Sequence, residues 1–238
     1  MKIFKNRAFT LAEVLITLGI IGVVAAMTIP ALLTKYQNQR NSALLREDYS
    51  IFSQMIKSAS NDNVTYSFTS SWNGDEMTDW FNSYILPYVK VVKVCGFKEK
   101  GCWADKAFWT DGERISKNDP TFPCGEFSMS FILNNGSYVC LSRHQFPSRS
   151  LGVKIEGFAP VLYIDTNGKE KPNMMGNDIF LFVLSEDEIL PAGSNKTLDE
   201  INKNCGLTCD KSWWVTNCGV YCTAKAANNG FKLPVIKK

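Results

Sequence analysis

Histidine is almost absent from this sequence, because His144 is the only one in 238 residues. A single histidine argues against catalysis by an imidazole base and against a multi-histidine metal site. P-loop, GxSxG, HExxH and Rossmann signatures are absent as well. His144 has no identifiable Ser or Cys nucleophile partner, so we predict a surface or turn position for it. These absences predict a protein without catalytic residues that is not an enzyme.

The chain also lacks a broad excess of charge of either sign. Lys2, Lys5 and Arg7 account for the whole formal net charge of +3, and the remainder of the chain is balanced. This balance argues against an extended surface for nucleic acid, although it leaves a local patch open. We therefore expect no nucleic-acid partner. The composition, 45% hydrophobic, is enough for one sizeable core.

A long apolar run follows the three basic residues and extends from Phe9 to Leu33, with Glu13 as its one charged residue. About 25 residues suffice to cross a bilayer of roughly 30 Å as a helix. The basic residues place positions 1–8 in the cytoplasm and the rest of the chain on the other side. The alternative is a cleaved secretory signal ending near Ala26. Two features argue against a secretory signal: the apolar regions of such signals are shorter than this run, and helical patterning continues past it.

The continuing pattern predicts that the helix extends well beyond the apolar run. An apolar stripe with 4-3-4-3 spacing predicts a face that packs on a core. It consists of Leu45, Tyr49, Phe52, Ile56 and Ala59, and the opposite face carries Arg46, Glu47, Asp48, Ser50 and Lys57. We predict one helix from Phe9 to about Ser60, with a bend at Pro30 and a stop at residues 61–63.

The segment RAFTLAEVLI, residues 7–16, resembles the processing site of type IV prepilins and type II secretion pseudopilins. The pattern of that family is a short basic leader, a small residue, Phe-Thr-Leu-x-Glu and an apolar helix. The resemblance covers residues 5 to about 40, and Gly22 and Pro30 fall where such helices commonly carry glycine and proline. One departure is Ala8, since the family usually has glycine before the cut.

The resemblance implies that prepilin peptidase cuts between Ala8 and Phe9 and that Phe9 is then N-methylated. The new α-amino group is substantially cationic at neutral pH. A carboxylate in hydrocarbon is costly, so Glu13 is expected to pair with the Phe9 amine of another subunit and to set the assembly register. The alternatives are that Glu13 snorkels to the interface or pairs only within its own chain.

The implied partners are other pilins or pseudopilins, prepilin peptidase and an inner-membrane assembly platform. The implied location is a single-pass position in the inner membrane, followed by a periplasmic or surface filament. We divide the chain into a leader (1–8), an assembly helix (9–35), its amphipathic half (36–60) and an extracytoplasmic head (61–238).

Short apolar runs broken by Gly, Asn, Pro and Ser predict a β-rich head. SMSFILNNGSYVCLS, residues 128–142, is typical of a hairpin whose turn contains Asn135-Gly136. APVLYID (159–165) and DIFLFVL (178–184) predict a second pair of strands. We expect an antiparallel sheet whose apolar face packs on the helix stripe and completes a single core, an α+β fold.

Eight cysteines follow the apolar run, which favours disulfides in an oxidising compartment. Cys95 and Cys102 are positioned to close a small loop, and Cys124 and Cys140 to pair across the hairpin. The pairing among the last four, which staple a C-terminal lobe, stays open: Cys205, Cys209, Cys218 and Cys222. Their spacing also permits zinc, but the compartment argues against it.

The segment from Asp165 to Asp178 resembles one that is common in pseudopilin-like heads. Its oxygen-bearing side chains at alternate positions, Asp165, Asn167 and later Asp178, make a candidate Ca²⁺ site. An EF-hand pattern is absent, and a polar strand connection with Asx turns is the alternative. No other cofactor is expected. Six tryptophans favour either ligand or subunit contact or ordinary packing: Trp72, Trp80, Trp103, Trp109, Trp213 and Trp214.

Together these features predict a structural subunit, a minor pilin or pseudopilin. The size and cysteine content of the head favour a minor subunit over a repeating major one. The rivals are a ligand-binding tip pilin, for adhesion or DNA uptake, and a single-span exported enzyme. The sequence does not separate secretion, adhesion or motility, and competence.

Overall fold

The computed structural model describes residues 10–64, 74–115, 124, 128–145, 147–209 and 218–233. The chain divides into two compact units, residues 1–40 and residues 41–238. The predicted boundaries at residues 8, 35 and 60 stay predictions.

Helix α1 spans Leu11–Asn61, close to the predicted range of Phe9 to about Ser60. It ends where the Asn-rich stop was expected. Asn63 adopts a positive φ of 56°, and the backbone N–H of Val64 donates to the carbonyl of Ala59 at 2.9 Å. Asparagine tolerates the left-handed conformation that closes a helix C-terminus, which explains the stop at this point.

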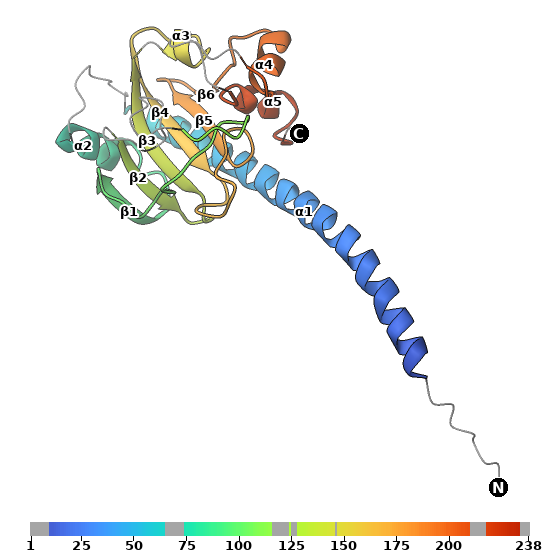
Figure 1. Ribbon diagram of the computed structural model, residues 1–238. Coiled ribbons are helices and arrows are strands. Elements are labelled where there is room, and N and C mark those ends of the chain that lie inside the picture. The colour runs from blue at the N-terminus through green and yellow to red at the C-terminus, as the bar shows by residue number, and fades with distance from the viewer. Residues whose placement is uncertain are drawn as a thin grey trace. The chain divides into compact units, whose positions relative to one another are not determined.

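Six antiparallel strands form one sheet in the order β1-β2-β3-β4-β5-β6 (Figure 1). Both predicted strand pairs are confirmed: β2 with β3 as a hairpin, and β4 with β5. The hairpin turn places Gly136 at a φ of 92°, which explains the glycine there. The strands are β1 (Val91–Phe97), β2 (Ser128–Leu133), β3 (Tyr138–Gln145), β4 (Phe158–Asp165), β5 (Ile179–Leu184) and β6 (Ile189–Pro191).

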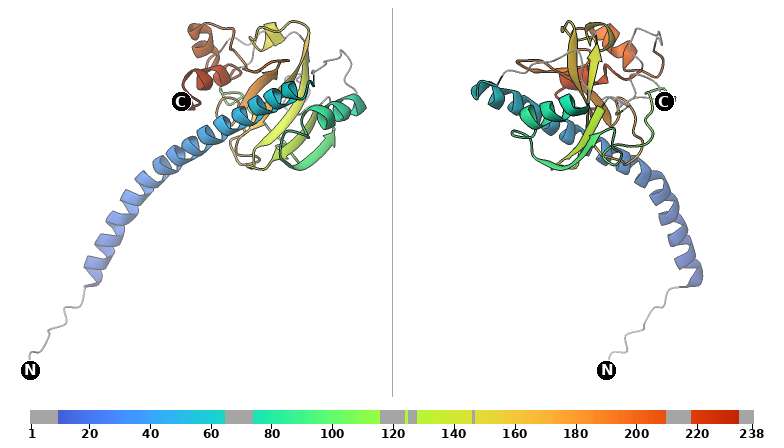
Figure 2. Two further views of the ribbon diagram at one scale, coloured as in Figure 1. Left: turned by 180° about the vertical axis from the view of Figure 1, so that it is seen from behind. Right: turned by 90° about the vertical axis from the view of Figure 1, so that its left-hand side faces the viewer.

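One face of the sheet packs on the second half of α1, as the apolar stripe predicts. Phe52 and Ile56 are buried in the same cluster as Phe131 and Phe182 of the sheet. Helix α2 (Gly74–Tyr84) adds to this cluster, with the rings of Phe81 and Phe131 5.0 Å apart. Figure 2 shows the end of α1 and α2 beside the sheet. The fold is α+β.

The opposite face of the sheet carries a second core cluster, so the prediction of a single core was wrong. Val161, Tyr163, Leu181 and Val183 point into it, in alternation with residues of the first cluster. Strands β4 and β5 are continuous apolar runs, which is typical of strands buried on both faces. The remaining helices are α3 (Pro147–Ser150), α4 (Leu198–Asn204) and α5 (Cys222–Asn228).

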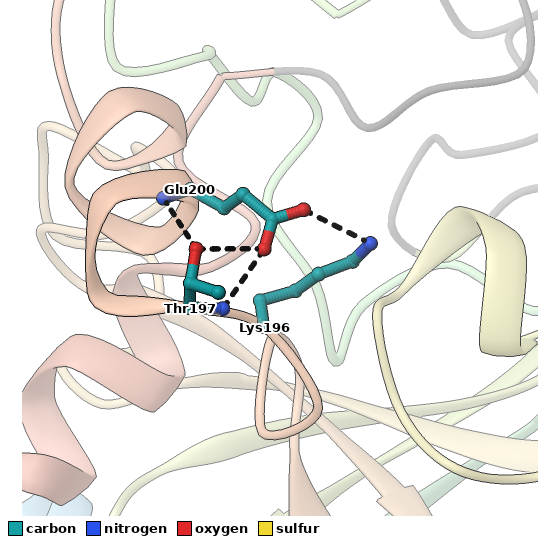
Figure 3. A network of polar contacts seen from close by, with 3 residues as sticks. All are labelled: Lys196, Thr197 and Glu200. Atoms are coloured by element: carbon teal, nitrogen blue, oxygen red, sulfur yellow. Dashed lines mark hydrogen bonds and ion pairs between the residues drawn. The ribbon is translucent and has the colours of Figure 1, made fainter.

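Helix α4 begins with a capping box (Figure 3). The Glu200 backbone N–H donates to Thr197 Oγ1 at 3.3 Å, and the Glu200 carboxylate accepts from the Thr197 backbone N–H at 2.9 Å. Lys196 adds an exposed ion pair to Glu200 at 3.4 Å. These contacts satisfy N–H groups that the first helical turn leaves unpaired, and they lower the pKa of Glu200.

All eight cysteines are in disulfides, so the zinc alternative is wrong. Cys95–Cys102 and Cys124–Cys140 pair as expected. The four cysteines whose pairing was open form Cys205–Cys222 and Cys209–Cys218. The first of these ties the end of α4 to the start of α5.

Peptide mapping of the unreduced protein is expected to return these four pairs. The double variant Cys205→Ser/Cys222→Ser should lose about 2–4 kcal/mol of unfolding free energy, because the unfolded chain regains the freedom of a closed loop. Denaturation of the oxidised protein measures this loss. A 205–209 or 218–222 pairing in the map would contradict the assignment.

Buried tryptophans support the packing interpretation over ligand contact. Trp80, Trp103 and Trp109 are each buried in a core cluster. Trp72, Trp213 and Trp214 lie outside the described residues.

Candidate functional site: the N-terminal helix and polar sites of the head

The first half of α1 exposes an apolar surface on all sides. Leu11 is 80% exposed and Met27 is 75% exposed, and no residue of its most apolar window is buried. Among the described residues, α1 is the one helix that is long and apolar enough to cross a membrane. The helix is therefore consistent with a single-pass membrane anchor.

Glu13 belongs to a capping box at the start of this helix. Thr10 donates to Glu13 Oε2 from its backbone N–H at 2.8 Å and from its hydroxyl at 2.9 Å. In return, the backbone N–H of Glu13 donates to Thr10 Oγ1 at 3.2 Å. The Thr-x-x-Glu pattern was in the sequence, but the role of Glu13 as a cap was missed.

The cap uses only one oxygen of the Glu13 carboxylate. Within the described residues, Oε1 accepts no hydrogen bond. Glu13 is therefore held in a defined orientation by Thr10 while one oxygen remains open to a donor from outside this set. The geometry is compatible both with pairing inside the chain and with the predicted contact to another subunit.

Threonine hydroxyls in this helix bond to backbone carbonyls of the preceding turn. Thr28 Oγ1 donates to the carbonyl of Val24 at 2.9 Å, and Thr34 Oγ1 donates to that of Pro30 at 3.0 Å. Such bonds satisfy hydroxyls in an apolar environment. Helix α1 continues through Pro30, and the bend there stays a prediction. Ala8 and Phe9 lie outside the described residues.

Comparison with known families adds an independent observation on this helix. Residues 3–29 match the prokaryotic N-terminal methylation motif. The motif is typical of type IV pilins and pseudopilins, which are structural proteins, and it implies processing by prepilin peptidase and assembly with other pilin subunits. It includes both predicted processing residues and Glu13. Comparisons with curated proteins and with solved structures found no match.

The candidate Ca²⁺ residues of the head come together beside β4 and β5. Asp165 and Asp178 are fully buried. The Asn167 backbone N–H donates to Asp165 Oδ1 at 3.3 Å, an Asx turn, and the Asn167 side chain donates to Asp178 Oδ2 at 3.3 Å. Asp178 also accepts from the backbone N–H groups of Asn173 and Met174.

Burial dominates the electrostatics of these two carboxyls. It raises the pKa of Asp178 to about 6, against the hydrogen bonds that it accepts. Burial and the nearby Asp178 charge raise the pKa of Asp165 well above its ordinary value. The described bonds match the Asx-turn alternative, and within the described residues no three His, Cys, Asp or Glu side chains gather for a metal. The Ca²⁺ site stays a prediction.

His144 lies within strand β3, half-buried, and not in the turn or surface position that was predicted. Its Nε2 is 3.2 Å from the Tyr163 hydroxyl, and its Nδ1 is 3.4 Å from Ser150 Oγ. The ring therefore links β3 to β4 and α3. Sequence reasoning missed Ser150 as a partner of His144, because the contact joins a strand to a separate short helix.

The position of Asp48 differs from the one that the sequence predicted. It was assigned to the polar face of the helix, but its side chain is fully buried. Oδ1 accepts from Asn135 Nδ2 at 2.8 Å, and Oδ2 accepts from Ser137 Oγ at 2.8 Å. Asp48 thus connects α1 to the β2–β3 turn. Its spacing from Leu45 and Phe52, three and four residues, was the signal that placed it on the buried face.

Burial raises the pKa of Asp48 to about 7. The two hydrogen bonds act in the opposite direction, and the neighbouring Glu47 charge adds slightly to the rise. A carboxyl that loses its hydration shell favours the neutral form, so this group titrates near neutral pH.

Proposed function

We propose that the chain is a minor pilin or pseudopilin that is cut between Ala8 and Phe9 and polymerises through α1. The match of residues 3–29 to the methylation motif carries this proposal. The exposed apolar surface of the helix supports it, because such a surface needs lipid or other helices around it. Before assembly the leader faces the cytoplasm and the head lies outside, next to an assembly platform in the inner membrane.

The chemistry of assembly rests on a charge pair between chains. Cleavage creates a cationic amine at Phe9, and the open Oε1 of Glu13 offers a carboxylate oxygen to the amine of a neighbouring subunit. Among packed apolar helices both charges are strongly destabilised unless they meet. Because the partner must bring its amine to one axial position, the pair selects the register of stacking.

The terminus of the native protein tests the processing step. N-terminal mass spectrometry is expected to find an N-methylated Phe9, since Ala8 is small enough to serve before the cut. An unprocessed control from cells without prepilin peptidase should begin with the leader. A native terminus at Met1, or one after Ala26, would contradict the proposal and favour a permanent anchor or a secretory signal.

A tip subunit that binds a ligand is the second candidate, and no described residue favours it over the first. Ligand contact was one interpretation of the tryptophans, and the three tryptophans that are described are buried. The choice among secretion, motility, adhesion and competence depends on the partners with which the chain assembles.

A further inference from the structure

A groove of about 560 Å³ lies between the second half of α1 and the turn that follows α5. Its floor includes Tyr49 and Phe231, whose rings are 4.7 Å apart. Ser53 Oγ is buried and, among the described residues, has no hydrogen-bond partner. Arg46 and Lys57 also line it. The groove thus combines an aromatic floor with two cationic side chains.

The two cations of the groove, Arg46 and Lys57, have no acidic partner among the described residues. Within the described part of the chain, neither Arg46 nor Lys57 forms an ion pair, and no acidic residue lines the groove. Arg46 and Lys57 are eleven positions apart on one helix, which is about 16 Å along the axis. A ligand that bridges this distance with carboxylates is therefore electrostatically favoured.

Residues 231–233, which follow α5, lead away from the open part of the groove. Phe231 packs on Tyr49, and two residues later the Leu233 backbone N–H donates to Ser42 Oγ at 3.1 Å. The chain thus runs toward the N-terminal end of α1, opposite to Ser53 and Lys57. The last residues of the chain are also basic at Lys237 and Lys238, which makes them a poor match for a cationic groove.

The same head presents an acidic turn of matching chemistry. Glu186, Asp187 and Glu188 are consecutive and exposed between β5 and β6. Two hydrogen bonds of Ser185 close this turn: its hydroxyl donates to the Glu188 carbonyl at 2.8 Å and accepts from the Glu188 backbone N–H at 3.0 Å. Among the described residues these carboxylates form no ion pair.

We propose that the acidic turn of one copy of this chain, residues 185–188, docks in the basic groove of a second copy. The carboxylates meet Arg46 and Lys57. Groove and turn are different patches, so the contact is head-to-tail and propagates, as a filament requires. This interface rests on the proposed function and adds a contact between heads to the one between helices.

Zero-length carbodiimide cross-linking tests the contact directly. Equal amounts of ¹⁴N- and ¹⁵N-labelled full-length protein are mixed in detergent without reducing agent, so that the disulfides stay intact. The mixture is then cross-linked at low and at high salt. Peptides joining Lys57 to Glu186, Asp187 or Glu188 with one label on each side are expected, and their yield should fall at high salt. Mixed-label peptides that join Lys57 to other acids, or same-label peptides only, would overturn the proposal.

Charge reversal in cells provides the second readout. Arg46→Glu/Lys57→Glu and Glu186→Lys/Glu188→Lys are each expected to lower filament incorporation about tenfold, because like charges then face each other. Combining all four substitutions should restore most of the loss. Lys100→Glu/Lys106→Glu, at two exposed lysines, is the matched control and should have little effect.

The outcomes separate this interface from the proposed function. If wild-type chains form filaments and the reversals have no effect, or the combined variant does not recover, the docking contact is wrong while the pilin function stands. If wild-type chains form no filaments but the mixed-label cross-link is found, the head contact stands and the filament function fails.

Discussion

Glu13→Gln is expected to insert normally in the membrane and to lower incorporation into filaments by about a hundredfold to a few thousandfold. Glutamine also serves at the third position of a capping box, so the bonds with Thr10 can persist. What is lost is the negative charge, which leaves the partner's Phe9 amine unpaired at a cost of about 3–5 kcal/mol. Each 1.4 kcal/mol is a factor of ten. Quantitative blotting of sheared filaments against membrane fractions measures the ratio.

Thr10→Ala is the matched control, because it removes the cap and keeps the carboxylate. It should cost about 1 kcal/mol of helix stability and leave incorporation near the wild-type level. Both variants need N-terminal mass spectrometry to establish normal cleavage before Phe9. Should Thr10→Ala abolish incorporation while Glu13→Gln retains it, Glu13 would act as a helix cap and the charge pair would be dismissed.

Stability of the head is expected to fall as the pH rises from 5 to 8, with Asp48 as an identifiable contributor. Its folded pKa, about 7, lies above the ordinary value of 3.8, so the folded state binds a proton that the unfolded chain releases. The favourable contribution is fully present below about pH 4 and is lost as the pH passes through 7. Between pH 5 and 8 the loss is about 2–3 kcal/mol.

Asp48→Asn isolates this contribution, since the amide cannot ionise and keeps an oxygen for Asn135. Denaturation of the oxidised full-length protein in detergent, followed by tryptophan fluorescence, should give a flatter pH profile for the variant. The variant should still lose some unfolding free energy as the pH rises, because the pKa values of Asp165 and Asp178 are also raised. Asp62→Asn, at an exposed position, should retain the full slope, and equal slopes in all three proteins would refute the assignment.

Local periodicity and turn chemistry made much of the architecture predictable. The apolar run and the stripe from Leu45 to Ala59 predicted α1 within about two residues at each end. Asn135-Gly136 predicted the hairpin, because this pair tolerates the positive φ of a tight turn. Helix α2, strands β1 and β6 and the C-terminal helices were not predicted, since short segments acquire their structure largely from packing.

The sequence by itself determined which part of the chain is apolar, where its first helix begins and ends, and that all eight cysteines follow the apolar run. These properties depend only on residues that are close together in the sequence. The methylation motif is a local property of the same kind. Only the tertiary structure decided that Asp48 is buried under the β2–β3 turn, that the sheet has two covered faces, and that Cys205 pairs with Cys222. Each of these joins residues distant in the chain, and such contacts depend on how the elements pack, which local sequence does not encode.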